Sequence, residues 1–275
     1  MMILNQANAA TLFQGQTESN RPDAAVLAGS LRQAMQQLKG DFFTSAGVDY
    51  RAMKASEAYA DYQKLSAQLQ QVDLQTLPDE AHKLAFWINL YNVLVMDGIL
   101  ALNVQRSVKD VPRFFQRVAY QIGSEVFSLD TIEHGLLRRN RKIYWFQRHP
   151  LASGDPRQRW MLASVDPRIH FALVCGAKSC PPIGVYQAEQ IEDQLELAAS
   201  GFVNSENVQL QPEQKRVLLS KIFDWYGADF GTRPQLLQWI ANRLRDPQQQ
   251  DWLKQNAQKV RIDWQPYDWQ LNQAA

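Results

Sequence analysis

The first hundred residues have apolar positions at helical spacing. Leucines and a methionine recur three or four residues apart between positions 24 and 38, and a comparable pattern covers 55–69. A longer segment, 79–101, follows Pro78 and has acidic residues in its first turn, where the helix dipole favours negative charge. The sequence therefore predicts an N-terminal layer of helices, preceded by a flexible polar segment at 1–22.

The pattern changes after residue 110, where apolar and polar residues alternate in short runs. These runs predict a hairpin at 117–129, a strand at 168–175, a second hairpin at 208–220 and a last strand within 259–272. Between them, helices are predicted at 131–139, 187–203, 234–245 and 249–256, with a long loop at 141–165. Because the strands occur mostly in hairpins, we predict an α+β fold with a mainly antiparallel sheet, in a single domain over 23–272.

Composition excludes several classes of function. Apolar residues make up 45% and charged residues 21% of the 275 residues, and the formal net charge is +1. This balance lacks the basic footprint of a nucleic-acid-binding protein, and no phosphate-binding or dinucleotide motif predicts a cofactor. We therefore expect a small molecule or a peptide as the partner.

The longest apolar stretch, 84–102, is interrupted by Asn89, Asn92 and Asp97. These polar residues favour a buried core helix over a membrane span. As written, the N-terminus predicts a cytoplasmic protein. An Ala-Asn-Ala sequence at 7–9 resembles a cleavage site and would indicate a periplasmic or exported protein if the true start lay upstream.

Two cysteines, Cys175 and Cys180, frame the main candidate for chemistry. If 168–175 is a regular strand, His170 and Cys175 point to opposite faces, so His134 is the better candidate base for a Cys175 nucleophile. Backbone amides at Gly176 would then stabilise an oxyanion, and Lys178 would lower the pKa of the thiol.

Other interpretations of the cysteines stay open. Cys175 also fits an inert, buried strand residue. Cys180 lies in a loop before two prolines, so it does not begin a helix as the papain nucleophile does. A disulfide between the two is compatible with their separation. A zinc site would need His134 and His170 as further ligands, and no characteristic Cys/His spacing supports it.

Further polar residues interrupt apolar segments. Glu133, beside His134, needs a partner if it is buried, and Arg168 or Arg138 would suit it. Asn89 and Asn92 lie one helical turn apart, and their amides either tie loops to the helix or line a pocket. Two aromatic–aspartate segments, 221–231 and 267–272, are interpreted as packed corners in preference to a carbohydrate platform.

Several of these segments together resemble the DUF547 family. The motifs are FWINLYNVLVMDGIL (86–100), SLDTIEHGLLR (128–138), DPRIHFALVCGAKSCPPI (166–183), KIFDWYGADFG (221–231) and YDWQLN (267–272). The resemblance covers roughly 55–272 and implies one domain, but the family has no established reaction, cofactor or substrate.

The leading functional hypothesis is a thiol-dependent hydrolase or acyl transferase. In it, Cys175 is the nucleophile, His134 the base, and Glu133 or Asn92 the group that orients the base. Cys180 and His170 are further catalytic candidates, and Asn89, Arg168, Gly176 and Lys178 complete the candidate binding residues. The alternative is a non-catalytic binding or scaffold domain whose motifs hold the fold.

Overall fold

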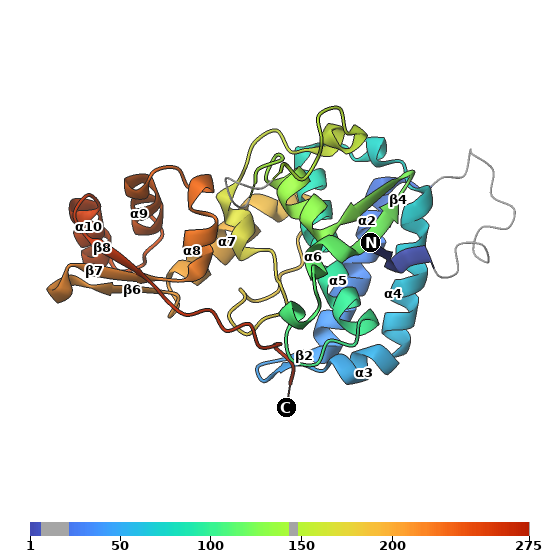
Figure 1. Cartoon of the computed structure of the whole chain (residues 1–275), viewed down its shortest axis with the longest axis horizontal. Helices are drawn as coiled ribbons and strands as arrows, with labels where there is room; N and C mark the ends of the chain where they lie inside the picture. The colour runs from blue at the N-terminus through green and yellow to red at the C-terminus, as the bar shows by residue number, and fades with distance from the viewer. Residues whose placement is uncertain (7–21, 143–147, 275) are drawn as a thin grey trace, which may run out of the picture.

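The computed structural model describes residues 1–6, 22–142 and 148–274. A mostly helical N-terminal part, with a small sheet, lies beside a C-terminal lobe that contains a second sheet (Figure 1). The predicted flexible segment 1–22 lies largely outside the described residues, and its first six residues do not fit the prediction. Asn5 is buried and donates to the carbonyl groups of Ser66 and Gln121, so this end of the chain is held against the fold.

The N-terminal helices confirm the predicted layer. Four α-helices form it: α2 (Ala24–Phe42), α3 (Tyr50–Ala55), α4 (Glu57–Ala67) and α5 (Glu80–Ala101). The helix predicted at 55–69 begins two residues later, at Glu57, because the side chain of Ser56 accepts a hydrogen bond from the amide of Tyr59 and caps α4. Short connections are β2 (Phe43–Thr44), β3 (Gly47–Val48) and the 3₁₀ turns η3 (Gln68–Gln71) and η4 (Leu74–Thr76).

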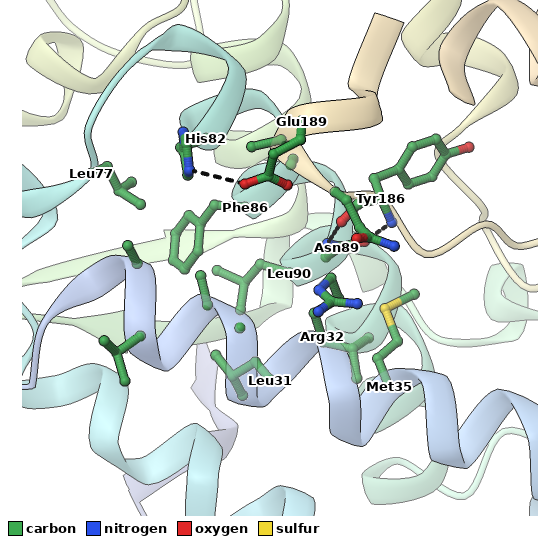
Figure 2. A pocket seen from close by; sticks show the side chains of 18 residues that line it. Leu31, Arg32, Met35, Leu77, His82, Phe86, Asn89, Leu90, Tyr186 and Glu189 are labelled. Carbon is green, nitrogen blue, oxygen red and sulfur yellow. Dashed lines mark hydrogen bonds and ion pairs between the residues drawn. The ribbon is translucent and has the colours of Figure 1, made fainter. Parts of the chain in front are cut away.

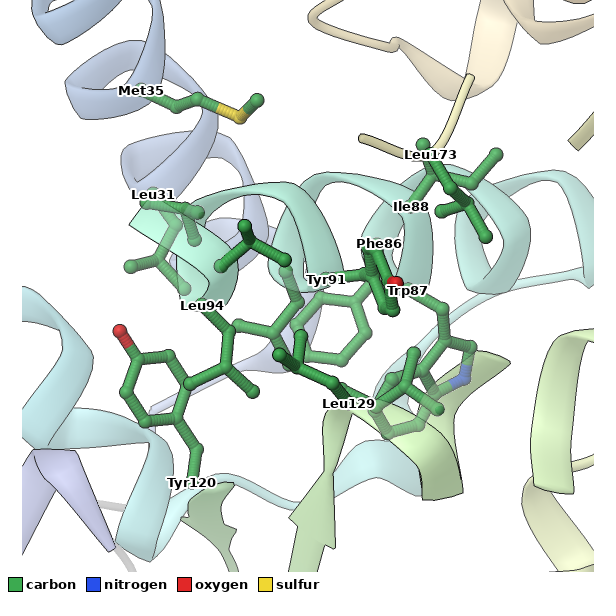
Figure 3. Close-up of a cluster of buried hydrophobic side chains, with 14 of the residues drawn as sticks. Leu31, Met35, Phe86, Trp87, Ile88, Tyr91, Leu94, Tyr120, Leu129 and Leu173 are labelled. Atoms are coloured by element: carbon green, nitrogen blue, oxygen red, sulfur yellow. The ribbon is translucent and has the colours of Figure 1, made fainter. Parts of the chain in front are cut away.

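Helix α5 is the centre of the larger core. Asp79 caps it by accepting from the amide of His82, and nearly every residue from Leu84 to Leu100 is buried. Leu31 and Met35 of α2 pack on one side of α5, and Tyr120 and Leu129 on another (Figure 3). The helix has the length and composition of a membrane span, but 89% of its apolar window is buried within the protein. The prediction of a buried core helix is confirmed.

A three-stranded sheet packs against this core. Its strands are β1 (Met2–Ile3), β4 (Val118–Ile122) and β5 (Glu125–Ser128), with β4 in the middle. The predicted hairpin is confirmed by antiparallel pairing of β4 with β5, whereas β1 pairs with β4 in parallel. Short helical segments flank the sheet: η1 (Leu4–Gln6), η5 (Val108–Asp110), α6 (Phe114–Arg117) and the π-helix η6 (Thr131–Leu137).

The predicted strand at 168–175 is wrong. Residues Pro167–Phe171 form a 3₁₀ helix, η8, and the chain beyond it is irregular as far as Gln187. Asp166 accepts a hydrogen bond from the amide of Arg168, and Pro167 occupies the first position, which is a helix-start signal that outweighs the alternation of apolar residues. The predicted long loop also contains a 3₁₀ turn, η7 (Pro156–Trp160), and its residues 143–147 lie outside the described part.

The C-terminal lobe has its own sheet and core. Its elements are η9 (Ala188–Gln190), α7 (Ile191–Val203), β6 (Val208–Gln211), η10 (Pro212–Gln214), β7 (Arg216–Leu219), α8 (Lys221–Trp225), η11 (Gly227–Asp229), α9 (Arg233–Ala241), α10 (Pro247–Asn256) and β8 (Arg261–Trp264). The predicted hairpin is confirmed as β6 and β7, and β8 adds to β7 in parallel. Phe171, Phe202, Phe223, Phe230 and Trp239 pack together beneath the sheet. The α+β class is confirmed, with small sheets of mixed direction.

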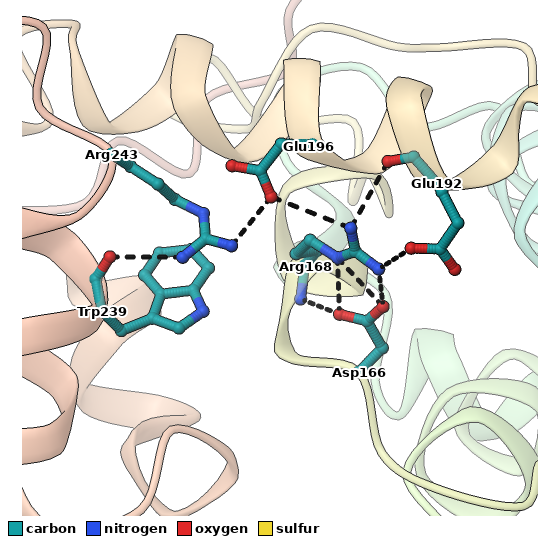
Figure 4. A network of polar contacts seen from close by, with 6 residues as sticks. All are labelled: Asp166, Arg168, Glu192, Glu196, Trp239 and Arg243. Carbon is teal, nitrogen blue, oxygen red and sulfur yellow. Dashed lines mark hydrogen bonds and ion pairs between the residues drawn. The ribbon is translucent and has the colours of Figure 1, made fainter.

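An ion-pair network fastens η8 to this lobe. The guanidinium of Arg168 contacts Asp166 and Glu192, both at 2.6 Å, and approaches Glu196 at 3.7 Å (Figure 4). Glu196 also accepts from Arg243, 2.8 Å away, so the network joins α7 to the region after α9. Arg168 therefore has a structural partner set of its own.

The segment 265–274, which we call the returning tail, leaves β8 and crosses to the N-terminal part (Figure 1). Its backbone bonds hold it there: the amide of Lys178 donates to Gln270, and the amide of Asn272 donates to Gly176. The amide of Ala274 donates to the carbonyl of Val48, at 2.9 Å. This path places Tyr267 and Trp269 over the loop that carries the cysteines.

Candidate functional site

A cavity of about 310 Å³ lies between the two cores. Its lining includes all five residues predicted as catalytic: Glu133, His134, His170, Cys175 and Cys180. Tyr91 of α5, Ile222 of α8 and Tyr226 also contribute to the lining. The structure therefore gathers candidates that come from two separate segments of the sequence, 128–138 and 166–183.

Cys175 and Cys180 form a disulfide in this structure, five residues apart. The amide of Cys175 donates to the sulfur of Cys180 at 2.9 Å, and the Tyr267 hydroxyl lies 3.2 Å from each sulfur. Both residues are only partly buried, so the interpretation of Cys175 as an inert core residue is wrong. The free Cys175 thiol of the leading hypothesis is not present either, because its sulfur is bonded.

His170 lines the same cavity as the cysteines, contrary to the alternation argument, which fails because 168–175 is not a strand. Its Nε2 donates to Asp229 at 2.9 Å, and its ring stacks on Tyr226 with centroids 3.9 Å apart. Its Nδ1 is buried without a hydrogen-bond partner among the described residues. Burial lowers the pKa of His170, although Asp229 opposes the shift, so the ring is neutral and Nδ1 carries a lone pair.

His134 is oriented by a donor, whereas His170 is oriented by an acceptor. A guanidinium nitrogen of Arg138 lies 2.9 Å from His134 Nδ1, and arginine can only donate. Nδ1 must therefore accept, which leaves the proton of the neutral ring on Nε2. Burial lowers the pKa of His134 and the charge of Arg138 lowers it further, against the opposing effect of Glu133. With Nδ1 accepting from Arg138 and the proton on Nε2, the neutral ring has no free lone pair of the kind that the predicted base role requires.

Glu133 is buried, and its partners are not the predicted arginines. The hydroxyl groups of Tyr91 and Tyr226 donate to its two carboxylate oxygens, at 2.8 and 2.6 Å. Burial alone would raise the pKa of Glu133, but the neighbouring imidazole of His134 and these two donors outweigh it, so the pKa is lowered. Glu133 is thus a buried carboxylate stabilised by tyrosines.

Arg138 instead pairs with Asp229, a residue that the sequence interpretation assigned to a packed corner. Arg138 Nε and a terminal nitrogen contact the two carboxylate oxygens at 2.6 and 3.1 Å, and Arg141 adds a third contact at 2.8 Å. The side chains of Arg138 and Asp229 are 2% and 0% exposed. Although burial opposes it, hydrogen bonds from His170 and Arg138 hold the pKa of Asp229 well below its usual range. Asp229 orients His170.

Three aromatic side chains form one wall of the cavity mouth, which we call the aromatic wall: Trp225, Tyr267 and Trp269. Their ring centroids lie 4.8–5.5 Å apart. The ammonium of Lys109 lies 4.0 Å from the centroid of Trp269, a cation–π contact. Two of these residues come from the returning tail, within the YDWQLN motif.

The candidate binding residues do not line this cavity. The side-chain amides of Asn89 and Asn92 form hydrogen bonds with backbone groups, of Tyr186 and of Ala172 and Val174 respectively. Arg168 lies in the ion-pair network with Asp166 and Glu192. Gly176 faces Ile99, and the ammonium of Lys178 contacts the side chain of Gln270. Asn92 matters indirectly, because its amide fixes the loop that carries Val174 into the cavity wall. The expectation that the asparagines tie loops to α5 fits these contacts.

A second cavity, of about 400 Å³, lies between α2, α5 and the residues around Tyr186 (Figure 2). Its walls are mainly apolar, and two of its polar side chains have partners at the cavity wall. His82 approaches Glu189 at 3.8 Å, and Asn89 bonds the Tyr186 backbone at 2.8 Å. None of the candidate catalytic side chains reaches it, so the smaller cavity is the better candidate for chemistry.

Metal binding was the third interpretation of the cysteines. Within the described ranges, no group of three or more His, Cys, Asp or Glu side chains has an arrangement that would hold a metal ion. Cys175 and Cys180 bond each other, and the two imidazoles bond Asp229 and Arg138.

Comparisons with known proteins identify part of the chain. No curated protein and no solved structure matches it. Residues 74–203 match the family described as "Protein of unknown function, DUF547". The match includes Glu133, His134, His170 and both cysteines, and it ends before Asp229 and the aromatic wall. It is shorter than the predicted resemblance over 55–272, and it shows that this chain carries a DUF547 domain.

Proposed function

We propose that the smaller cavity is the active site of a thiol-dependent enzyme of the hydrolase or acyl-transfer class, active once the Cys175–Cys180 disulfide is reduced. The observation that supports it best is a buried imidazole acceptor, His170 Nδ1, in the lining that also contains both sulfurs. Asp229 fixes the other ring nitrogen, as an orienting acid does in a nucleophile–histidine–acid set.

Reduction by a dithiol supplies two electrons and two protons and gives two thiols. The Cys180 sulfur accepts a hydrogen bond from the amide of Cys175 at 2.9 Å, whereas the Tyr267 hydroxyl lies 3.2 Å from both sulfurs and does not distinguish them. Donors to a thiolate stabilise it and lower the thiol pKa. We therefore assign the nucleophile to Cys180, in place of Cys175, and assign Cys175 the role of its redox partner.

The thiolate attacks a carbonyl carbon of the substrate, and a carbon–sulfur bond forms. His170, having taken the thiol proton, gives it to the leaving group as the acyl–leaving-group bond breaks. Water or another acceptor then attacks the thioester, loses a proton to His170 and releases the acyl product, and the proton returns to the sulfur. The Nε2 proton of His134 is a donor to the oxyanion in this scheme, a role first expected for Gly176. A Cβ on Gly176 would lie only 2.6 Å from Ile99, so this backbone faces the other side of the loop.

Alkylation tests the thiol role directly. The reduced protein is treated with iodoacetamide across pH, and the modified cysteine is mapped by mass spectrometry. We expect Cys180 to react first, with an apparent pKa below about 8.5, the value of a free thiol. His170→Gln should move that pKa upward, and His82→Gln, at a histidine outside this cavity, should leave it unchanged.

Turnover of an activated ester tests the reaction class. We expect the reduced protein to release a burst of nitrophenol from p-nitrophenyl acetate and to carry an acetyl group on Cys180. The oxidised protein and Cys180→Ser should show neither signal. Two slow thiols with ordinary pKa values, and no acetylated cysteine, would refute an enzyme and leave a binding domain.

A further inference from the structure

The aromatic wall and the acidic side chains beside it suggest what the cavity binds. Six aromatic side chains line the cavity: Tyr91, Phe115, Trp225, Tyr226, Tyr267 and Trp269. The faces of such rings carry negative electrostatic potential and attract cations. Lys109 already lies over Trp269, which shows that this wall accommodates an ammonium group.

The charges in the lining favour the same kind of ligand. Among the described lining residues, Asp130 and Glu133 are the carboxylates and Lys109 is the one ammonium. Neither carboxylate forms an ion pair with a lysine or arginine in the part of the chain described, and the nearby imidazoles are neutral for the reasons given above. Glu133 is stabilised by its tyrosine donors, whereas burial raises the pKa of Asp130 and so disfavours its charged form. A cationic ligand beside Asp130 offsets that cost.

The hydrogen-bonding needs of His170 agree with the charges. Its Nδ1 is a buried acceptor that no described residue satisfies. An ammonium group has three donors, so it can serve this nitrogen and a carboxylate together. A neutral sugar would also stack on the aromatic wall, but it would leave the charge of Asp130 without a cationic partner.

We propose that the cavity binds a substrate bearing a primary amine, with its ammonium group between the aromatic wall and Asp130 and Glu133. Resting on the proposed thiol function, the amine is the acyl acceptor. The ammonium passes one proton to His170 Nδ1, and the freed lone pair attacks the thioester carbon. The carbon–sulfur bond breaks as the carbon–nitrogen bond forms, and a second proton leaves to solvent. The products are an amide, a thiolate and an imidazolium.

Ligand binding is tested in the oxidised protein, where no thiol reacts. Benzylamine, benzyl alcohol and benzoate share a shape and differ in charge, and titration calorimetry gives their affinities. We expect benzylamine to bind at least ten times more tightly than the alcohol, with benzoate weakest. Asp130→Asn and Trp269→Leu should each weaken benzylamine binding about tenfold, and Lys109→Met should tighten it severalfold by removing a competing cation.

A matched control is Asp224→Asn, which removes a carboxylate that pairs with Lys221 outside the cavity and should change nothing. Equal binding of amine and alcohol, preference for benzoate, or insensitivity to both Asp130→Asn and Trp269→Leu would overturn the inference. If the thiols react as proposed but the cavity shows no preference for the amine, the amine inference fails and the proposed thiol function stands. If benzylamine binds as expected but the thiols are inert, the proposed reaction and its acceptor step fail, and only the class of ligand stands.

Discussion

Replacing Asp229 is the most informative single perturbation of the site. Its carboxylate accepts from Arg138, Arg141 and His170, and its side chain is fully buried. Asp229→Ala leaves the guanidinium of Arg138 buried without a counter-ion, and breaking a buried pair in this way costs about 3–5 kcal/mol. The half-exposed Arg141 contact adds only about 0–1 kcal/mol.

The loss is measured by urea unfolding, followed by tryptophan fluorescence and circular dichroism. A cost of this size lowers Tm on the order of 10 °C and is a large part of the roughly 5–15 kcal/mol that stabilises a typical protein. The double variant Asp229→Leu/Arg138→Met removes both charges, and we expect it to recover most of the loss, because apolar replacement of a buried pair is often neutral.

Two results would refute this reasoning. If Asp229→Ala costs less than about 1 kcal/mol, the pair is not desolvated as described. If the double variant is no more stable than Asp229→Ala, the cost comes from something other than the unpaired guanidinium.

Three further predictions concern the core, the loop and pH. Gly98→Ala puts a methyl group 2.8 Å from a side-chain carbon of β4, and we expect it to lower the free energy of unfolding in urea by about 1–3 kcal/mol. Gly201→Ala, in open space on α7, should raise that free energy by about 0.5–1 kcal/mol. Equal effects of the two variants would contradict the packing described at Gly98. Asn92→Ala leaves two buried backbone groups unpaired and should cost at least about 2 kcal/mol, so a Tm within 2 °C of wild type (~1 kcal/mol or less) would count against it. Because the pKa of His170 is lowered in the folded state, the unfolded chain takes up a proton first, so stability declines as pH falls below about 6.5. The lowered pKa of Asp229 adds a second decline below about 4. Asp229→Asn should flatten this second decline in pH-dependent unfolding, and an unchanged slope would contradict the assignment.

The sequence predicted local structure well where one signal dominated. The spacing of Leu27 to Leu38 and the Asp79 cap specify α2 and α5, and the hairpins follow from alternation around turns. The segment 168–175 shows the limit. Its apolar alternation suggested a strand, but the Asp-Pro start of η8 decided the outcome, because a side-chain cap satisfies backbone donors that a lone strand would leave exposed.

The candidate site was predicted in composition but not in arrangement. All five catalytic candidates line one cavity. The pairing of Asp229 with His170, 59 residues apart, has no local signal, because it depends on how η11 packs against η8. The signal that was available was the FDWYGADFG motif, which was interpreted as packing alone.

The returning tail affects the order in which the molecule is completed during synthesis. Ala274 and Asn272 bond Val48 and Gly176, so contacts that close the cavity join residues separated by as many as 226 positions. Contacts over such distances are entropically expensive and form late. A nascent chain that has emerged only as far as β8 therefore has the carboxylates, the imidazoles and the cysteines in place but lacks Tyr267 and Trp269. The aromatic wall, to which the proposed amine recognition is assigned, is completed only when the tail leaves the ribosome.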